Sequence, residues 1–234
     1  MIRRLLIALF LLLVAALVVV DRVGERVAAH VLAEKLQADE HLQHRPAASI
    51  GGFPFLTQAF AGKYDDVNVT AHDFKTPDGV PVQTLTVHLH GVHIPLSEVL
   101  HGSVSRVPVD HANGSATLTF AGIARYLTGQ NFAVTLSKAS SNSVDVIRKI
   151  PFGGSTVLAE GTATITVQQD VITLSVGQLR VSGTGGGVRR VPTAPYLLSI
   201  PLRSLPFRIN VTSVTVTQTG ITGTGTANHF VMGS

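Results

Sequence analysis

The stretch IGGFPFLTQAFAGKYDDVNV, residues 50–69, decides the fold because its period changes in the middle. Its first half gathers large apolar residues around Pro54, which suits the first turn of a short helix over Phe55–Ala61. Gly62 suits the end of that helix. The alternation that follows in YDDVNVTAHDF predicts a strand with one apolar face. The apolar turn itself fits either a globular core or a surface that dips into lipid.

The N-terminus has the pattern of an exported protein. Arg3 and Arg4 precede sixteen uninterrupted apolar residues, Leu5–Val20. Asp21 and Arg22 end the run. This order is typical of a secretory signal, but the run is longer than most signal cores, and no small-x-small cleavage site follows. We therefore favour an uncleaved membrane anchor over a cleaved signal peptide for residues 1–22, and both place the rest of the chain outside the cytoplasm.

An amphipathic helix is expected directly after the apolar run. One row of valines recurs every four residues, and a second apolar row lies beside it (Val23, Val27, Val31; Ala28, Leu32, Leu36). Together the two rows form one broad apolar face over residues 23–38. Such a face must be buried, and a sheet is the expected partner.

The remainder of the chain has the two-residue period of strands. In VQTLTVHLHGVHI the apolar positions change phase at Gly91, which predicts a β-bulge. The VTQTGIT and QQD segments predict hairpin connections, and SGTGGGVRRVPTAPY predicts an irregular region. Further strands are expected at Thr117–Phe120, Phe132–Leu136, Val144–Ile147, Thr156–Val167, Val171–Val181, Phe207–Thr217 and Ile221–Phe230, and short helices at Leu96–His101 and Ala121–Leu127.

This succession predicts an α+β fold: a long N-terminal helix packed in a curved, mostly antiparallel sheet. No interior stretch is polar or long enough to be a linker, so residues 23–234 are expected to form a single domain.

Composition and motifs exclude several kinds of chemistry. The chain has no cysteine, which removes disulfides, thiolate metal sites and cysteine nucleophiles. It has no G-x-S-x-G elbow, and its glycines match neither a P-loop nor a dinucleotide fingerprint. We therefore predict no catalytic residue, no cofactor and no enzymatic activity. Residues 138–208 carry eight basic side chains against three acidic ones, which favours anionic lipid or polymer as a neighbour. Nucleic acid is not expected outside the cell.

A histidine-rich strand is the main exception to this shortage of reactive groups. His88 and His90 lie two apart and share a strand face, and His93 can rejoin them after Gly91. Two histidines of a strand can hold zinc when a third ligand is near. Here no carboxylate lies within the segment, and the shared face is opposite the apolar one. We expect solvent-exposed histidines and no metal site.

Large apolar side chains recur in segments where exposure is costly. FAGIARYLTG has four at helical spacing, and APYLLSIPLRSLPF crowds several among prolines, which predicts a loop or short turns. Such a loop can fold back as a lid on the core, or it can form a mouth that touches acyl chains, with arginines for a phosphate headgroup. The candidate lipid-contacting residues are Phe53, Phe55, Leu56, Phe60, Phe120, Ile123, Tyr126, Leu127, Tyr196, Leu198, Leu202 and Phe207, with Arg190, Arg203 and Arg208 as headgroup candidates.

Two of these segments carry a resemblance that covers nearly the whole chain. IGGFPFLTQAFAGKYDDVNV after an anchor and an amphipathic helix, together with LRSLPFRINVTSVTVTQTGITGTGTA, resembles the actinobacterial LmeA-type phospholipid-binding proteins. Its most specific part is Gly-Phe-Pro-Phe-Leu-Thr-Gln. The resemblance implies a cell-envelope protein on the extracytoplasmic, periplasmic side of the inner membrane with a lipid-transfer (TULIP-like) shape. It further implies binding of phospholipids such as phosphatidylinositol, and support of lipomannan-type mannolipid elongation. The histidine-rich strand and GTGGGVRR depart from that pattern, which leaves the choice of lipid open.

Three hypotheses follow for function. The first is a non-enzymatic binder or carrier whose helix and sheet leave an apolar groove for acyl chains, at about 0.8 kcal/mol per buried methylene. The second is an envelope hydrolase or transferase that uses dispersed groups such as His88, His90 and Asp66. The third is a scaffold that recruits membrane glycosyltransferases through exposed apolar loops.

Overall fold

The computed structural model describes residues 2–77, 79–95, 97–98, 106–152, 155–168, 171–176, 179–182, 188–191, 196–201 and 210–232. For residues 152, 155, 168, 171–172, 179, 182, 188–191 and 196–201 it describes the backbone alone. The chain divides into two compact units. Unit 1 comprises residues 1–70, 87–112 and 228–234, and unit 2 comprises residues 71–86 and 113–227. The predicted domain limits, 1–22 and 23–234, stay a prediction.

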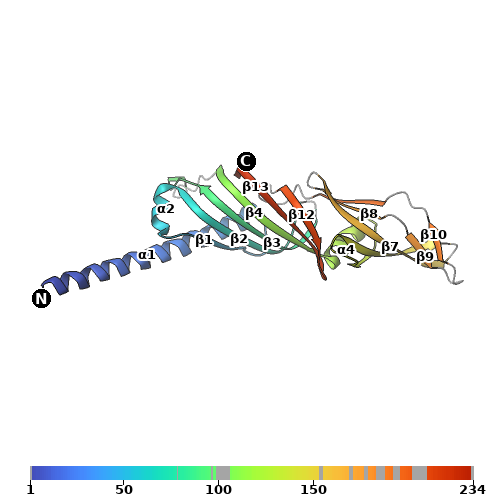
Figure 1. Ribbon diagram of the computed structural model, residues 1–234, viewed down its shortest axis with the longest axis horizontal. Helices are drawn as coiled ribbons and strands as arrows, with labels where there is room; N and C mark the ends of the chain where they lie inside the picture. The colour runs from blue at the N-terminus through green and yellow to red at the C-terminus, as the bar shows by residue number, and fades with distance from the viewer. Residues whose placement is uncertain are drawn as a thin grey trace. The chain divides into compact units, whose positions relative to one another are not determined.

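Helix α1 is one continuous helix over Ile2–Asp39 (Figure 1). Every residue from position 2 to 20 is exposed, and the helix is long and apolar enough to cross a membrane. Its second half follows the apolar run without a break, as the sequence predicts. The apolar run and the amphipathic helix are therefore parts of a single element.

The face that α1 buries differs from the prediction. Val23, Val27 and Val31 are each more than half exposed, whereas Ala29 and Ala33 are buried. Helix α1 packs against strand β1, Ala47–Gly51. Small side chains let a helix backbone approach its partner closely, so the alanine row docks and the bulkier valine row stays outside. The second predicted row, Ala28, Leu32 and Leu36, is half-buried beside these alanines. Periodicity therefore located the helix and one side of its contact stripe, and the valine row is the part that was wrong.

The first sheet has the strand order β1-β2-β3-β4-β13-β12. Its strands after β1 are β2 Lys63–Lys75, β3 Pro81–His93, β4 Val107–Thr119, β13 Gly220–Met232 and β12 Asn210–Val216. Strands β1 and β2 pair antiparallel, and so do β12 and β13, which form the predicted VTQTGIT hairpin. The α+β class with a mostly antiparallel sheet is therefore confirmed.

Burial along β2 and β3 follows the predicted alternation. The buried positions are Val67, Val69 and Ala71 in β2, and Leu85, Val87 and Leu89 in β3. The phase changes at Gly91, whose φ is +63°, and Val92 is buried next. A positive φ is readily adopted only by glycine, so this residue permits the phase change that the sequence predicts.

The second sheet has the order β10-β9-β7-β6-β5, with β8 paired to β7 and β11 paired to β8. The strands are β5 Thr135–Lys138, β6 Ser143–Phe152, β7 Ser155–Gln168, β8 Val171–Val176, β9 Leu179–Ser182, β10 Val188–Val191 and β11 Tyr196–Pro201. One edge of β7 pairs with β6, and the other is shared by β8 and β9.

Three local predictions for this region are wrong. The single strand expected at Val171–Val181 is two strands, because β8 and β9 pair with different parts of β7. Residues 188–191, expected to be irregular, form β10 against β9. Residues 196–201, expected to be a loop or turns, form β11 against β8. Pro201 is the terminal residue of β11, a position at which the missing N–H interrupts no ladder.

Helix α4, Phe120–Gly129, begins directly after β4 and covers the core of unit 2. Thr119 caps it, since its hydroxyl oxygen accepts the Gly122 N–H at 3.0 Å. The helix was predicted to begin one residue later and to end two residues earlier. Of the helix predicted at Leu96–His101, Ser97 and Glu98 are helical. The other four residues of that range, Leu96, Val99, Leu100 and His101, lie outside the described residues.

Candidate functional site

The Phe-Pro-Phe stretch forms helix α2, Phe55–Ala61, as predicted. Pro54 is its N-cap, in extended conformation, and so lies one position before the predicted first turn. Gly62 ends the helix with a left-handed φ of +66°, and its N–H donates to the carbonyl oxygens of Gln58 and Ala59. Both helix ends are therefore fixed by the two residues that the sequence singled out.

A carboxylate at the end of the apolar run holds the start of α2. Asp21 is only 3% exposed, and its Oδ1 accepts the Leu56 N–H at 2.8 Å. The first N–H groups of a helix have no partner within the helix, and a negative charge there is favourable. Asp21 therefore joins α2 to the point where the apolar run of α1 stops.

A buried amide holds the other side of α2. The Gln58 side chain donates from Nε2 to the Gly51 carbonyl at 3.1 Å and accepts the Asp65 N–H through Oε1 at 2.9 Å. Gly52, with φ of +90°, leaves room for it, because a Cβ there would lie 2.5 Å from Nε2. Helix α2 is thus tied to the end of β1 and the start of β2.

The four apolar candidates in this stretch have different surroundings. Phe55 is buried against Gly24 of α1 and the ring of Tyr64, whose centroid is 6.1 Å away. Leu56 is half-buried. Phe53 is 59% exposed and Phe60 is 78% exposed. The stretch therefore fills the core with one ring and presents two rings at the surface.

Arg22 lies beside one of the exposed rings. Its guanidinium carbon is 5.3 Å from the centre of the Phe53 ring, within the range of a cation–π contact. Arg22 also follows Asp21 directly, so the two residues that end the apolar run both contact the α2 region.

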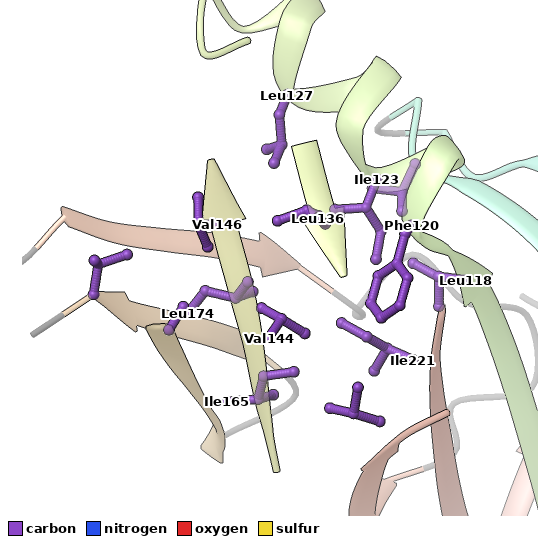
Figure 2. Close-up of a cluster of buried hydrophobic side chains, with 14 residues drawn as sticks. Leu118, Phe120, Ile123, Leu127, Leu136, Val144, Val146, Ile165, Leu174 and Ile221 are labelled. Atoms are coloured by element: carbon purple, nitrogen blue, oxygen red, sulfur yellow. The ribbon is translucent and has the colours of Figure 1, made fainter. Parts of the chain in front are cut away.

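The candidates on α4 lie in the core of unit 2. Phe120, Ile123 and Leu127 are buried and point toward the strands below the helix, where Val144, Leu174 and Ile221 meet them (Figure 2). Tyr126 is half-buried against the same cluster. This packing gives them a role in stability, and their contact with lipid stays a prediction.

The remaining candidates lie where side chains are not described. Tyr196 and Leu198 are placed as backbone positions of β11, and Arg190 as a backbone position of β10. Leu202, Arg203, Phe207 and Arg208 lie outside the described residues. Their lipid and headgroup roles stay predictions.

The strand register adds a basic residue that sequence reasoning did not select. In the β9–β10 pair, Arg190 is the partner of Arg180, and in the β7–β9 pair, Arg180 is the partner of Glu160. Like charges at directly opposed positions destabilise a sheet. Glu160 offsets this repulsion on one side of Arg180, and a further anion near Arg190 would offset it on the other. Spacing along the sequence could not reveal the pair, because only the register brings the two strands together.

The histidines lie on a polar face and have separate partners. His88 and His90 are exposed opposite the buried face of β3, as predicted. His88 hydrogen-bonds with Asn68, and the His90 Nδ1 is 3.6 Å from Asp66 Oδ1. The His90 and His111 rings stack with centroids 6.1 Å apart. Among the described residues no group of three or more His, Asp or Glu side chains is placed to hold a metal ion.

One carboxylate reaches across a strand. Asp110 on β4 lies 3.6 Å from Lys63 Nζ on β2, and β3 is the strand between them. The crossing occurs over Gly91, where a Cβ would lie 2.2 Å from Asp110 Oδ2. Asp110 Oδ1 also meets His93 Nε2 at 3.2 Å. Gly91 therefore both permits the phase change in β3 and makes room for this charge cluster.

These contacts set the direction of the Asp110 pKa. Desolvation raises it, but the hydrogen bond and charge of His93 and the charge of Lys63 outweigh that effect and bring the pKa below its ordinary value of 3.8. Because the folded pKa is the lower one, the ionised carboxylate stabilises the fold above pH 3.8. That contribution is lost as the pH falls through the lowered value.

We expect a carboxyl NMR titration to place the Asp110 midpoint below 3.8, and Lys63→Met or His93→Gln to move it upward. Lys75→Met is the matched control, because Lys75 is exposed at the other end of the same strand. A midpoint of 3.8 or above in the unmodified chain, or equal shifts in all three variants, would contradict the assigned contacts.

A family model described as LmeA-like phospholipid-binding matches residues 19–226. No curated protein and no solved structure matches the chain.

Proposed function

The chain belongs to the LmeA-like phospholipid-binding family, and from that premise we propose that it binds or transfers an anionic, phosphatidylinositol-like phospholipid without catalysing a reaction. The match over residues 19–226 is the observation that carries the proposal, because it includes α2, α4 and every strand of both sheets except the second half of β13. We place this activity in the cell envelope, at the extracytoplasmic face of the inner membrane. The exposed apolar run Leu5–Val20 supports an association with membrane.

The preference for an anionic headgroup is supported by the charge pattern of the second sheet. Arg180 is exposed and is the register partner of Arg190, with one acidic residue, Glu160, next in the row. A phosphate or phosphoinositol group between two arginines would relieve their repulsion and accept several hydrogen bonds. Arg203 and Arg208 are further headgroup candidates from the sequence.

Supply of such a lipid to mannolipid synthesis is the biological role we propose, namely support of lipomannan-type elongation. The proposal includes envelope glycosyltransferases as consumers of the bound lipid. A scaffold that recruits those enzymes is the alternative, and the exposed rings Phe53 and Phe60 are the surface that favours it. The hydrolase alternative receives no comparable support, because each described histidine of β3 contacts its own partner instead of converging on a cleft.

The test is the lipid that the full chain retains. Purified from membranes in mild detergent and analysed by native mass spectrometry, the protein should carry phospholipid in which anionic species are enriched over the source membrane. Arg180→Gln with Arg190→Gln should reduce that enrichment. The matched control is Arg125→Gln, which removes one exposed cation on α4. Protein that carries no phospholipid, or the same mixture as the membrane, would overturn the proposal.

A further inference from the structure

We propose that the rings of Phe53 and Phe60 insert into the interface of the lipid bilayer that holds the apolar run of α1, so that α2 rests on the headgroup layer. The partner of this surface is the bilayer itself and not a lipid held inside the protein. The inference therefore does not depend on the proposed function.

The first argument is exposure. Outside α1, the large apolar side chains exposed among the described residues are Phe53, Phe60, Leu158 and Val231. The two aromatic ones lie seven positions apart, one before α2 and one within it, and the helix's other ring, Phe55, is buried. Aromatic rings on a short surface element next to cations are typical of segments that lie in a membrane interface.

The second argument is position along α1. The run Leu5–Val20 spans about 24 Å as a helix, whereas a hydrocarbon core is about 30 Å thick. A short span draws its flanking residues to the boundary of the membrane. Those residues are Asp21 and Arg22. Asp21 Oδ1 accepts the Leu56 N–H at 2.8 Å, and the Arg22 guanidinium carbon lies 5.3 Å from the centre of the Phe53 ring. The contacts therefore hold α2 at the level where the hydrocarbon ends.

The third argument is charge. Arg22 and Arg26 are exposed and one helical turn apart, so they lie on the same side of α1. Cations immediately outside an apolar span interact favourably with anionic headgroups. The Asp21 carboxylate is buried and accepts a hydrogen bond, and Glu25, the other acidic residue on this part of α1, is half-buried. The two exposed phenylalanine rings, the two arginines and the burial of the Asp21 carboxylate together match the chemistry of a lipid surface.

The absence of cysteine allows a direct depth measurement on the full chain. Phe53→Cys and Phe60→Cys variants, labelled with an environment-sensitive fluorophore, would be placed in nanodiscs of phosphatidylcholine with phosphatidylglycerol and nitroxide-labelled lipids. Leu12→Cys is the deep control. Ala38→Cys is the water-exposed control, since it is exposed and lies about 27 Å along the helix axis from Val20.

We expect the labels at 53 and 60 to emit at shorter wavelength and to be quenched by nitroxides near the headgroups, at a depth of about 5–10 Å. The label at 12 should be quenched by nitroxides deep in the chains, and the label at 38 by neither. Labels at 53 and 60 that behave like the label at 38 would overturn the proposal. So would a wavelength shift that depends on protein concentration, which indicates a second copy, or quenching that persists in detergent, which indicates a lipid held by the protein.

Discussion

Replacing Ile123 with alanine should lower the free energy of unfolding by about 2–5 kcal/mol. Ile123 is 1% exposed and projects from α4 into the core cluster of unit 2, which includes residues from strands of both sheets (Figure 2). Removing its outer carbons leaves a cavity that rigid neighbours cannot fill. Denaturant titration of the full chain in detergent, followed by far-UV circular dichroism, measures the loss. The chain has no tryptophan to serve as a fluorescence probe.

The same variant separates a core role from a lipid-contacting role. If the Ile123 side chain is packed only by the protein, its truncation should cost the same stability in delipidated and in lipid-loaded protein. If the side chain instead lines a lipid site, its truncation should weaken lipid retention and should cost little stability when lipid is absent. Leu158→Ala is the matched control, since Leu158 is 41% exposed in the same unit and should cost clearly less. A loss of lipid with unchanged stability of the delipidated protein would show that Ile123 contacts lipid.

Local signals in the sequence were sufficient for α2 and for the phase change in β3. Pro54, Gly62 and Gly91 act through their own backbone conformations, so the residue type alone indicates the structure. The outward direction of Phe60 was also available from the helical period. It lies five positions after the buried Phe55, which is about 140° around the helix. The candidate lipid contacts predicted from the sequence include Phe55 and Phe60 alike, although the helical period places them on different sides of α2.

Strand β4 shows why other elements were not predictable. Its sequence VPVDHANGSATLT contains Asn113-Gly114, which is a strong local signal for a turn, and only its end was predicted as strand. In the structure β4 lies between β3 and β13, so both of its edges have partners. Pairing with strands distant in sequence outweighed the local preference. Strand β11 was missed for the same reason, because its partner is β8.

The contacts that position α2 have the same character. Asp21 reads in the sequence as the polar end of an apolar run, and its partner, the Leu56 N–H, is 35 residues away. Gln58 likewise gave no signal, because a single buried glutamine has no pattern around it. Polar contacts of this kind depend on which elements meet in space. The sequence therefore located the apolar surface, but not the residues that hold it.

Gly220 is enclosed by backbone at the junction of β4 and α4. Its N–H donates to Thr217 Oγ1 at 3.2 Å, and the neighbouring Thr219 carbonyl accepts the Phe120 N–H at 3.0 Å. The first bond closes the β12–β13 turn, and the second holds that turn directly on the first residue of α4. A Cβ at position 220 would lie 2.1 Å from the Leu118 carbonyl oxygen and 2.8 Å from the Thr119 Cα. Both atoms belong to the backbone, so the overlap is removed only if the turn and the strand move apart.

Gly220→Ala should therefore destabilise the protein by about 3 kcal/mol, at the upper end of the usual cost of overpacking. The separation should also weaken the Phe120–Thr219 hydrogen bond, so amide exchange at Phe120 should become faster. Gly129→Ala is the matched control, because a Cβ there meets no atom within 4 Å and alanine favours the helix. Denaturant titration of both variants beside the parent measures the difference. Equal stability of the two variants would mean that the turn yields to the added methyl group, and that it does not fix the start of α4.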